Sequence, residues 1–395
     1  MKKEETAKEK DPSLVAADNL AEKGKMAFLS YTWKLNKKCD DSYDSSEINP
    51  YSDEKWANDV SCPEYDLKLA FDFYQQALPI YQEQKRYSRD MAVLYEDLGT
   101  VCDAMNDMPS ALDYYYKALS LYNQLSIIGE EEDFSELLER IKDAEKKFGL
   151  HIVHEGNKCG FADKDNNIVI PCIWNDVQEF DEGLCGVKDD NQLCGFINYH
   201  GEVVIPCIYK DAYSFENGLA YVEENVDDDF PHTFYIESDG SVIASDFELK
   251  TNQIEAVYKS TIFARFGKHA EAAECILPAI GTLDPKPKRL LMLYLTLSEQ
   301  YDKLIEICNK TIMYDGRSEL VVIARLLLAM AYEEGKGVEQ DLIQAFRYFD
   351  SVRFENNISD DDYKQVDEFL KRHPEMLELP EVKNALAPLD EDEDF

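Results

Sequence analysis

The sequence is short of positive charge. Its 395 residues include 41 Lys and Arg against 80 Asp and Glu, which gives a formal net charge of -39 and a pI near 4.4. Binding to nucleic acid phosphates or to an anionic membrane surface needs clustered Lys and Arg. We therefore expect neither a nucleic acid nor a membrane as a partner. Most of the acidity is expected to serve solubility, with attraction to one basic partner as the alternative.

Long apolar runs are also missing. The first residues, MKKEETAKEKDPSL, stay charged and lack the apolar core of a secretory signal. The most apolar stretch, from Leu320 to Tyr332, contains Arg325 and is shorter than the roughly 20 residues that span a bilayer. The sequence therefore predicts no membrane-spanning helix and a cytoplasmic location.

No CxxC pair occurs among the ten cysteines, which favours a reducing compartment. Cys159, Cys172, Cys194 and Cys207 resemble a metal-binding set at first. However, the first and third are equivalent positions of an internal repeat, as are the second and fourth, and structural zinc sites usually place two ligands within a few residues. We expect no metal and no cofactor.

Motifs for catalysis are missing as well. The stretch EGKGV, residues 334–338, lacks the glycine spacing of a phosphate-binding loop. His151 and His154 lie three apart on an expected strand and would point to opposite faces. Neither a G-x-S-x-G elbow nor an HExxH pair occurs. We expect no catalytic or cofactor-binding residue, although the sequence alone leaves enzymatic activity open.

What the sequence does contain is repetition. IPCIWNDVQEFDEGL from Ile170 to Leu184 returns as IPCIYKDAYSFENGL from Ile205 to Leu219, about 35 residues later. With their flanks the two units begin at Cys159 and Cys194, and a partial third copy, FYIESDGSVIAS, covers residues 234–245. Such a period indicates stacked structural units that bury their apolar faces against each other.

Each unit alternates short β-branched and aromatic stretches with turn residues, which predicts antiparallel strands joined by tight turns. Proline cannot donate to a sheet ladder, so Pro171 and Pro206 are expected at a strand end or on an edge. Gly183 and Gly218 are expected where φ is positive or where a side chain would clash. The residues given a structural role in the repeat are Gly160, Phe161, Pro171, Trp174, Gly183, Gly195, Phe196, Pro206, Tyr209 and Gly218.

At these residues the sequence resembles the WG-containing repeat family, over about Gly156 to Ser245. It departs from the family pattern where Cys159 and Cys194 stand in place of the Trp that usually precedes the first Gly. The resemblance implies a structural or binding surface and no shared chemistry.

The residues before this region have apolar side chains at three- and four-residue spacing. AFDFYQQALPIYQE from Ala70 and ALDYYYKALSLYNQ from Ala111 are alike. Between two expected helices, Gly99, Ala111 and Ala118 would permit close approach, while Tyr95, Leu98 and Tyr115 would fill the seam. This region resembles a tetratricopeptide repeat.

Helices are expected again after the β-region. Residues 324–352, ARLLLAMAYEEGKGVEQDLIQAFRYFDSV, resemble the Sel-like relative of the tetratricopeptide repeat, and residues 263–285 carry a further second-helix pattern. The acidic end, LDEDEDF, is expected to be disordered.

We therefore predict an α+β multidomain chain, with tetratricopeptide-like helical solenoids on both sides of a central antiparallel β-repeat module. The expected boundaries are a disordered segment at 1–12, a helical domain at 13–149, the β-rich module at 150–248, a helical domain at 249–380 and an acidic tail at 381–395. Residues 38–66 combine turn formers and acids without periodicity, which favours a long loop.

The expected function is non-catalytic protein–protein interaction or scaffolding, because helical solenoids present a concave groove. The resemblance implies that the first helix of a repeat lines this groove. Glu96, Thr100 and Asp103 share one face of that helix, and we hypothesise that they bind a basic or amide-rich protein or peptide. The simpler alternative is a solvated helix face. Two other classes stay open: a small-molecule or enzymatic site where the β-module meets the helices, and an acidic immunity- or antitoxin-like protein that binds one basic target.

Overall fold

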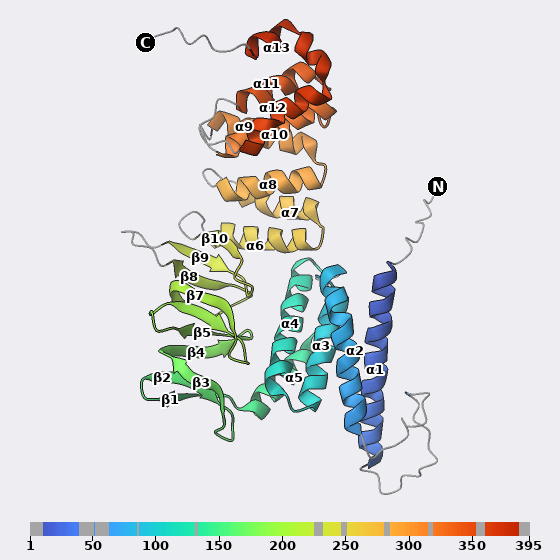
Figure 1. Cartoon of the computed structure of the whole chain (residues 1–395), viewed down its shortest axis with the longest axis vertical. Coiled ribbons are helices and arrows are strands. Elements are labelled where there is room, and N and C mark those ends of the chain that lie inside the picture. Colours follow the sequence, from blue (N-terminus) through green and yellow to red (C-terminus); the bar gives the residue numbers. More distant parts are fainter. Residues whose placement is uncertain are drawn as a thin grey trace. The chain divides into compact units, whose positions relative to one another are not determined.

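A computed structural model of the chain describes residues 11–38, 51, 63–84, 87–130, 133–224, 232–245, 251–279, 285–314, 319–352 and 360–386. The chain divides into two compact units, Met1–Phe247 and Glu248–Phe395. Along the sequence, α-helical repeats precede and follow a central module of antiparallel strands (Figure 1). This confirms the predicted fold class.

The described part of the first unit starts with helices that pack beside one another in chain order (Figure 1). Their bounds are α1 (Pro12–Lys38), α2 (Pro63–Gln84), α3 (Arg89–Ala104), α4 (Met108–Ile127) and α5 (Ser135–Phe148). Side-chain caps mark where two of them begin: Ser88 accepts a hydrogen bond from the Met91 amide at 3.2 Å, and Asp107 accepts one from the Ser110 amide at 3.3 Å. Such caps satisfy amides that have no partner within the first helical turn.

The seam between α3 and α4 depends on a glycine. A Cβ at Gly99 would lie 2.5 Å from the ring of Tyr115, so only glycine lets the two helices come this close. Leu98, Ala111 and Ala118 are fully buried around it. The predicted seam is therefore confirmed, and Tyr95 of α3 adds a ring contact to α4, 6.1 Å from the ring of Tyr114.

An ion pair is buried between α1 and α2. Lys34 Nζ lies 2.9 Å from Asp66 Oδ2, and the two side chains are only 1% and 2% exposed. The Ser30 hydroxyl donates a hydrogen bond to the same carboxylate. Because charges lose their hydration on burial, each partner needs the other to stay in this environment.

Strands follow α5 in the described residues and form two sheets. Their bounds are β1 (His151–Glu155), β2 (Lys158–Ala162), β3 (Ile168–Trp174), β4 (Asp176–Asp181), β5 (Leu184–Lys188), β6 (Cys194–Ile197), β7 (Val203–Ala212), β8 (Ala220–Glu224), β9 (Thr233–Ile236) and β10 (Val242–Ser245). One sheet has the order β1-β2-β3, and the other has the order β10-β9-β8-β7-β6-β5-β4, with antiparallel pairing throughout. This agrees with the predicted antiparallel module.

The two full repeat units have matching cores. The rings of Phe161 and Phe180 meet edge to face at 5.2 Å and 62°, and those of Phe196 and Phe215 do so at 4.9 Å and 63°. Trp174 and Tyr209 are buried at the equivalent place in the two cores. Cys159 and Cys194, at the start of the two units, are also buried.

Turns close all three units in the same way. The Asp163, Asn198 and Glu237 amides each donate to the carbonyl four residues later, at 3.0 Å. Gly201, in the second turn, lies against Ile170 of the first unit, and Gly240, in the third, lies against Ile205 of the second. The second and third turns therefore each cover the core of the unit before them.

The repeat glycines and prolines have local reasons for their identity. φ is +89° at Gly183 and +83° at Gly218, a region that favours glycine. A Cβ at Gly160 or Gly195 would lie 2.4 or 2.5 Å from a carbonyl oxygen of the neighbouring strand. Pro171 lies in β3, an edge strand of its sheet.

Pro206 lies inside β7, which has β6 and β8 as neighbours, rather than at a strand end or on an edge strand. The β7–β8 ladder starts only at Tyr209, and the β6–β7 register shifts on either side of Phe196. Proline is tolerated because this half of the strand is paired irregularly and on one side.

The second unit is helical in its described residues. Its elements are α6 (Thr251–Arg265), α7 (His269–Ile276), η2 (Leu277–Ala279), α8 (Pro285–Leu297), α9 (Tyr301–Tyr314), α10 (Glu319–Glu334), α11 (Leu342–Val352), α12 (Asp360–Arg372), η3 (Pro374–Glu378) and α13 (Pro380–Ala385). Glu333 of α10 accepts hydrogen bonds from Arg372 at 2.8 and 3.0 Å and contacts His373 at 2.9 Å. This cluster ties α10 to the end of α12.

Three expected boundaries differ from the structure. Helix α1 begins at Pro12 rather than after it, and α2 begins at Pro63, within the segment expected to be a loop. Helix α13 occupies part of the expected acidic tail, because Val382 is buried in the core around Phe346 and Phe369. The expected disorder at residues 1–10 and 387–395, and most of the loop at 39–62, lie outside the described residues.

No helix in the described part of the chain is both long and apolar enough to cross a membrane.

Breaking the buried ion pair of α1 and α2 tests its role in stability. We expect Lys34→Met or Asp66→Leu alone to lower the free energy of unfolding by about 3–5 kcal/mol, because each removes one of the two opposite charges of a buried ion pair. The double variant should lose less than either single variant. Urea unfolding followed by circular dichroism measures all three, and a double variant that loses the sum of the two single effects would contradict this account.

Candidate functional site

The predicted peptide-binding side chains of α3 lie together on one face, and that face contacts α5. Arg140 donates to the Thr100 hydroxyl at 2.8 Å, and its Nε lies 3.9 Å from a Glu96 carboxylate oxygen. Lys147 donates to both carboxylate oxygens of Asp103, at 2.7 and 2.9 Å. The Tyr122 hydroxyl donates to Glu96 at 3.1 Å. The face therefore binds basic side chains, and these come from the same chain.

The contact with α5 follows from the packing of that helix. Leu137, Ile141, Ala144 and Phe148 are buried at three- and four-residue spacing, which fixes the side of α5 that faces the other helices. The basic side chains at the margin of this apolar side then reach the carboxylates of α3. Binding of a separate peptide to the α3 face remains a prediction, and such a peptide would share these groups with α5.

Asp97 was not singled out from the sequence, but the structure gives it an unusual environment. Burial, reinforced by the charge of Glu96, raises its pKa to about 6, although a hydrogen bond from the Tyr74 hydroxyl and the charges of Lys25 and Arg140 act in the opposite direction. The signal was available: Asp97 lies between Leu94, Leu98 and Val101 of the buried helix stripe, where a carboxylate is out of place.

A second polar cluster lies where α4 meets the β-module. His200 Nε2 is 3.2 Å from the Ser110 hydroxyl and 3.7 Å from Asp113 Oδ2. The Tyr199 amide donates to Asp113 Oδ1 at 3.4 Å. Burial raises the pKa of Asp113, while the charges of Lys117 and His200 oppose this shift.

This cluster contains the residue types of a Ser-His-Asp triad, but its geometry differs. In a triad the carboxylate holds one ring nitrogen while the serine hydroxyl uses the other. Here serine and aspartate both approach Nε2 of His200. The carboxylate therefore cannot orient the imidazole to accept the serine proton. The cluster links the helix to the turn at Asn198–Gly201 instead.

Aromatic rings fill the rest of this junction. The Tyr199 ring stacks on Phe180 at 4.2 Å and 11°, and on Tyr116 at 6.2 Å and 18°. The Tyr116 hydroxyl donates to Glu145 of α5 at 2.7 Å. A Cβ at Gly183 would lie 2.8 Å from Tyr116, so this glycine is needed for close contact as well as for its φ.

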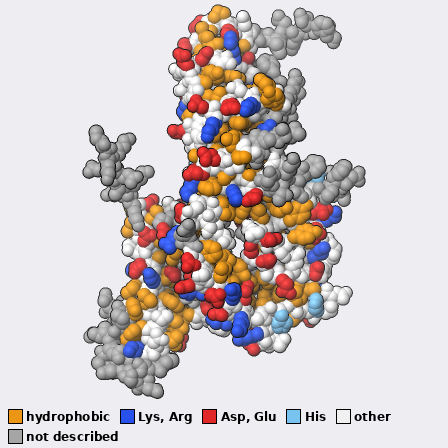
Figure 2. Space-filling model, turned by 180° about the vertical axis from the view of Figure 1, so that it is seen from behind, with side chains coloured by type: hydrophobic (Ala, Val, Ile, Leu, Met, Phe, Trp, Pro, Cys, Tyr) orange, Lys and Arg blue, Asp and Glu red, His pale blue; other side chains and the backbone are white. Residues whose placement is uncertain are grey.

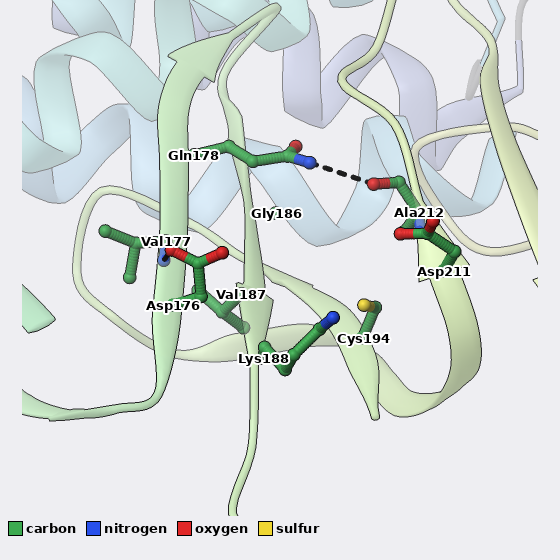
Figure 3. A pocket seen from close by; sticks show the side chains of 9 residues that line it. All are labelled: Asp176, Val177, Gln178, Gly186, Val187, Lys188, Cys194, Asp211 and Ala212. Carbon is green, nitrogen blue, oxygen red and sulfur yellow. Dashed lines mark hydrogen bonds between the residues drawn. The ribbon is translucent and has the colours of Figure 1, made fainter. Parts of the chain in front are cut away.

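The β-module contains a pocket of about 60 Å³ between the first and second repeat units. Figure 3 shows the side chains that line it. Asp176 and Asp211, at equivalent positions of the two units, line it together with Lys188. Gln178 lies over Gly186 and donates to the Ala212 carbonyl at 2.8 Å. By volume the space suits a few water molecules.

The cysteines near these groups are poor nucleophiles. Burial raises the pKa of Cys194, which lines the pocket, even though the charge of Lys188 favours its thiolate. Burial also raises the pKa of Cys159, whose sulfur lies 3.3 Å from His154 Nδ1. Because the thiolate is the reactive form, neither site is prepared for covalent chemistry. In the described residues, no group of three or more His, Cys, Asp or Glu side chains is arranged to hold a metal ion.

The raised pKa of Asp97 predicts a pH dependence of stability. The folded pKa of about 6 lies above the ordinary 3.8, so between these values the folded chain holds a proton that the unfolded chain has released. Stability should therefore fall as pH rises from about 4 to about 6 and stay lower above this range.

Asp97→Asn should remove this effect, so the free energy of unfolding lost between pH 4 and pH 7.5 should be about 1–3 kcal/mol smaller in the variant than in the original chain. Urea unfolding at both pH values measures the change. Asp143→Asn, at an exposed position of α5, is the control and should leave the pH dependence as it is. An equal pH dependence in Asp97→Asn and in the original chain would show the account to be wrong.

Comparison with known families gives two matches. The family described as WG containing repeat matches residues 160–192 and 195–225, and the family described as Tetratricopeptide repeat matches residues 66–124. None of the curated proteins compared with the chain matches it. The matched residues coincide with the two full β-units and with α2 to α4. The chain is thus similar to WG containing repeats over the two β-units and to tetratricopeptide repeats over α2 to α4.

Proposed function

We propose that this protein is a non-catalytic binding protein whose repeats present a surface to a basic protein partner. The observation that supports this most is the acidic face of α3. It belongs to the segment similar to tetratricopeptide repeats, and its carboxylates already hold a guanidinium and an ammonium group of α5. A basic segment of a partner would bind by the same chemistry, since carboxylates pair well with both groups.

The α3 face has capacity left for such a partner. The side chains of Glu96 and Asp103 are 24% and 20% exposed beside the basic groups of α5. An ionised carboxylate accepts about four hydrogen bonds, more than α5 supplies to either group. We propose that Glu96, Thr100 and Asp103 take up further donors from the partner while α5 stays in place.

The acidity of the rest of the surface fits a more general role. On the side of the molecule drawn in Figure 2, carboxylates are scattered over helices and strands and are mixed with Lys and Arg. Such a distribution favours solubility over one strong binding patch. Selective binding is therefore assigned to the α3 face and not to the overall net charge.

Several further expectations belong to this proposal. We propose that α10 and α11 form a Sel-like repeat, supported by positive φ at Gly335 and Gly337 in the connection between the two helices. We also propose three domains near the predicted limits 13–149, 150–248 and 249–380, with the first starting at Pro12 and the last extended to Ala385, and a cytoplasmic location. An immunity-like protein would differ from a general scaffold in having one tight, salt-sensitive complex.

Affinity capture from a native lysate tests the proposal. Tagged protein is compared with the variant Glu96→Gln with Asp103→Asn, at low and at moderate salt, and bound proteins are identified by mass spectrometry. We expect a small set of basic proteins on the original chain and about tenfold less of them on the variant, because two partly exposed ion pairs contribute up to about 1 kcal/mol each.

The control carries the same charge change at exposed positions of α5, Glu139→Gln with Asp143→Asn. It should retain the partners, and thermal unfolding must show that both variants stay folded. If all three proteins capture the same partners equally, the α3 face is not the binding surface. If no partner is retained at either salt concentration, the proposed function is wrong.

A further inference from the structure

Three tyrosines form a ladder across adjacent strands at the end of the β-module. Tyr213 directly follows β7, Tyr221 lies in β8 and Tyr235 lies in β9. Tyr221 and Tyr235 are register partners, and the Tyr213 amide donates to the Tyr221 carbonyl at 2.9 Å. The rings of Tyr213 and Tyr221 are 5.8 Å apart at 51°, and those of Tyr221 and Tyr235 are 5.2 Å apart at 58°. Tyr213 is 57% exposed.

The preceding repeat unit shows that the fold does not require this ladder. Gln178 and Gly186 occupy the positions that correspond to Tyr213 and Tyr221. There the Gln178 side chain lies over the glycine and forms one wall of the pocket in Figure 3. Because both units fold alike with such different side chains, the rings at Tyr213 and Tyr221 need a reason other than repeat packing.

Acidic groups accompany the ladder on the same strands. Glu223 follows Tyr221 by two residues and so lies on the same side of β8. Asp211, two residues before Tyr213, is the register partner of Glu223, which places the two carboxyl-bearing residues side by side. Glu223 already pairs with a cation, Lys210. Residues 151–245 contain 19 Asp and Glu against four Lys and no Arg.

We infer that the tyrosine ladder, with Asp211 and Glu223, binds arginine side chains of the partner protein. A guanidinium group is planar, stacks on aromatic rings and donates to carboxylates at the same time, which a lysine ammonium group does less well. Residues 151–245 contain no arginine, so an arginine that contacts the ladder would come from outside this segment. This inference rests on the proposed function and adds the chemistry of a second contact surface to it.

Isothermal titration calorimetry of the full chain tests the inference. The probe is hexa-arginine, acetylated and amidated at its ends, at 150 mM NaCl. We expect Tyr213→Ser to weaken binding about two- to fivefold, as removal of an exposed cation–π contact should. Hexa-lysine should bind the original chain more weakly and should not respond to this change. Asp211→Asn should also weaken binding of hexa-arginine.

Matched controls separate the ladder from the general acidity. Tyr314→Ser makes the same change at a tyrosine that is 75% exposed in the second unit, and Asp165→Asn removes an exposed carboxylate elsewhere in the β-module. Both should bind hexa-arginine like the original chain. Because Tyr213 is largely exposed, its replacement should keep the thermal midpoint, and circular dichroism checks the fold.

A local readout completes the test. In protein with ¹³C-labelled tyrosine rings, the resonance that disappears in Tyr213→Ser identifies Tyr213, and hexa-arginine should shift it. Three results would each overturn the inference. Tyr213→Ser could bind hexa-arginine as tightly as the original chain does, the substitution could weaken hexa-lysine binding as much as hexa-arginine binding, or hexa-arginine could leave the Tyr213 resonance unshifted. If lysate partners still bind in that case, the proposed function stands without the ladder. If no partner is captured, the proposed function fails on its own test.

Discussion

The first compact unit depends on the packing of one ring, that of Tyr199. This residue lies in the turn after β6, with its ring against Phe180 of the β-module and against Tyr116 and Phe148 of the helices. Its amide also bonds to Asp113 of α4. Helices and strands meet here through a buried aromatic stack. Because of the relative orientation of the rings, such a stack stabilises the fold by more than the burial of its apolar area alone. The stack therefore joins α4 and α5 to the β-module.

Much of the fold could be predicted from local sequence patterns. The period of about 35 residues located the two β-units, since equivalent positions must repeat if units are to stack. The small residues around Gly99 predicted a close helix contact, because only a missing side chain makes room for the Tyr115 ring. The position of Pro206 inside β7 was harder to predict. A proline is tolerated there because the β7–β8 ladder begins only at Tyr209, and no local sequence pattern shows where that ladder begins.

The candidate site was less predictable. The shared face of Glu96, Thr100 and Asp103 followed from helical spacing, but the partners of these groups did not. Arg140 and Lys147 are 40 and 44 residues away from Thr100 and Asp103, and only the three-dimensional path of the chain brings them together. The same holds for Ser110 and His200, which are 90 residues apart. Ser110, His200 and Asp113 have the residue types of a reactive site, but in the structure they link α4 to the turn after β6.

The turns of the β-module have a consequence for how the chain is made. Gly201 of the second unit covers Ile170 of the first, and Gly240 of the third covers Ile205 of the second. Chains are synthesised from the N-terminus. A unit that has just left the ribosome therefore still lacks the turn of the next unit, which will cover its apolar core. Its apolar core stays open to water for about one repeat of further translation. Folding of this module is thus expected to trail synthesis by one unit, and the third, partial copy completes the core of the second without needing a full unit after it.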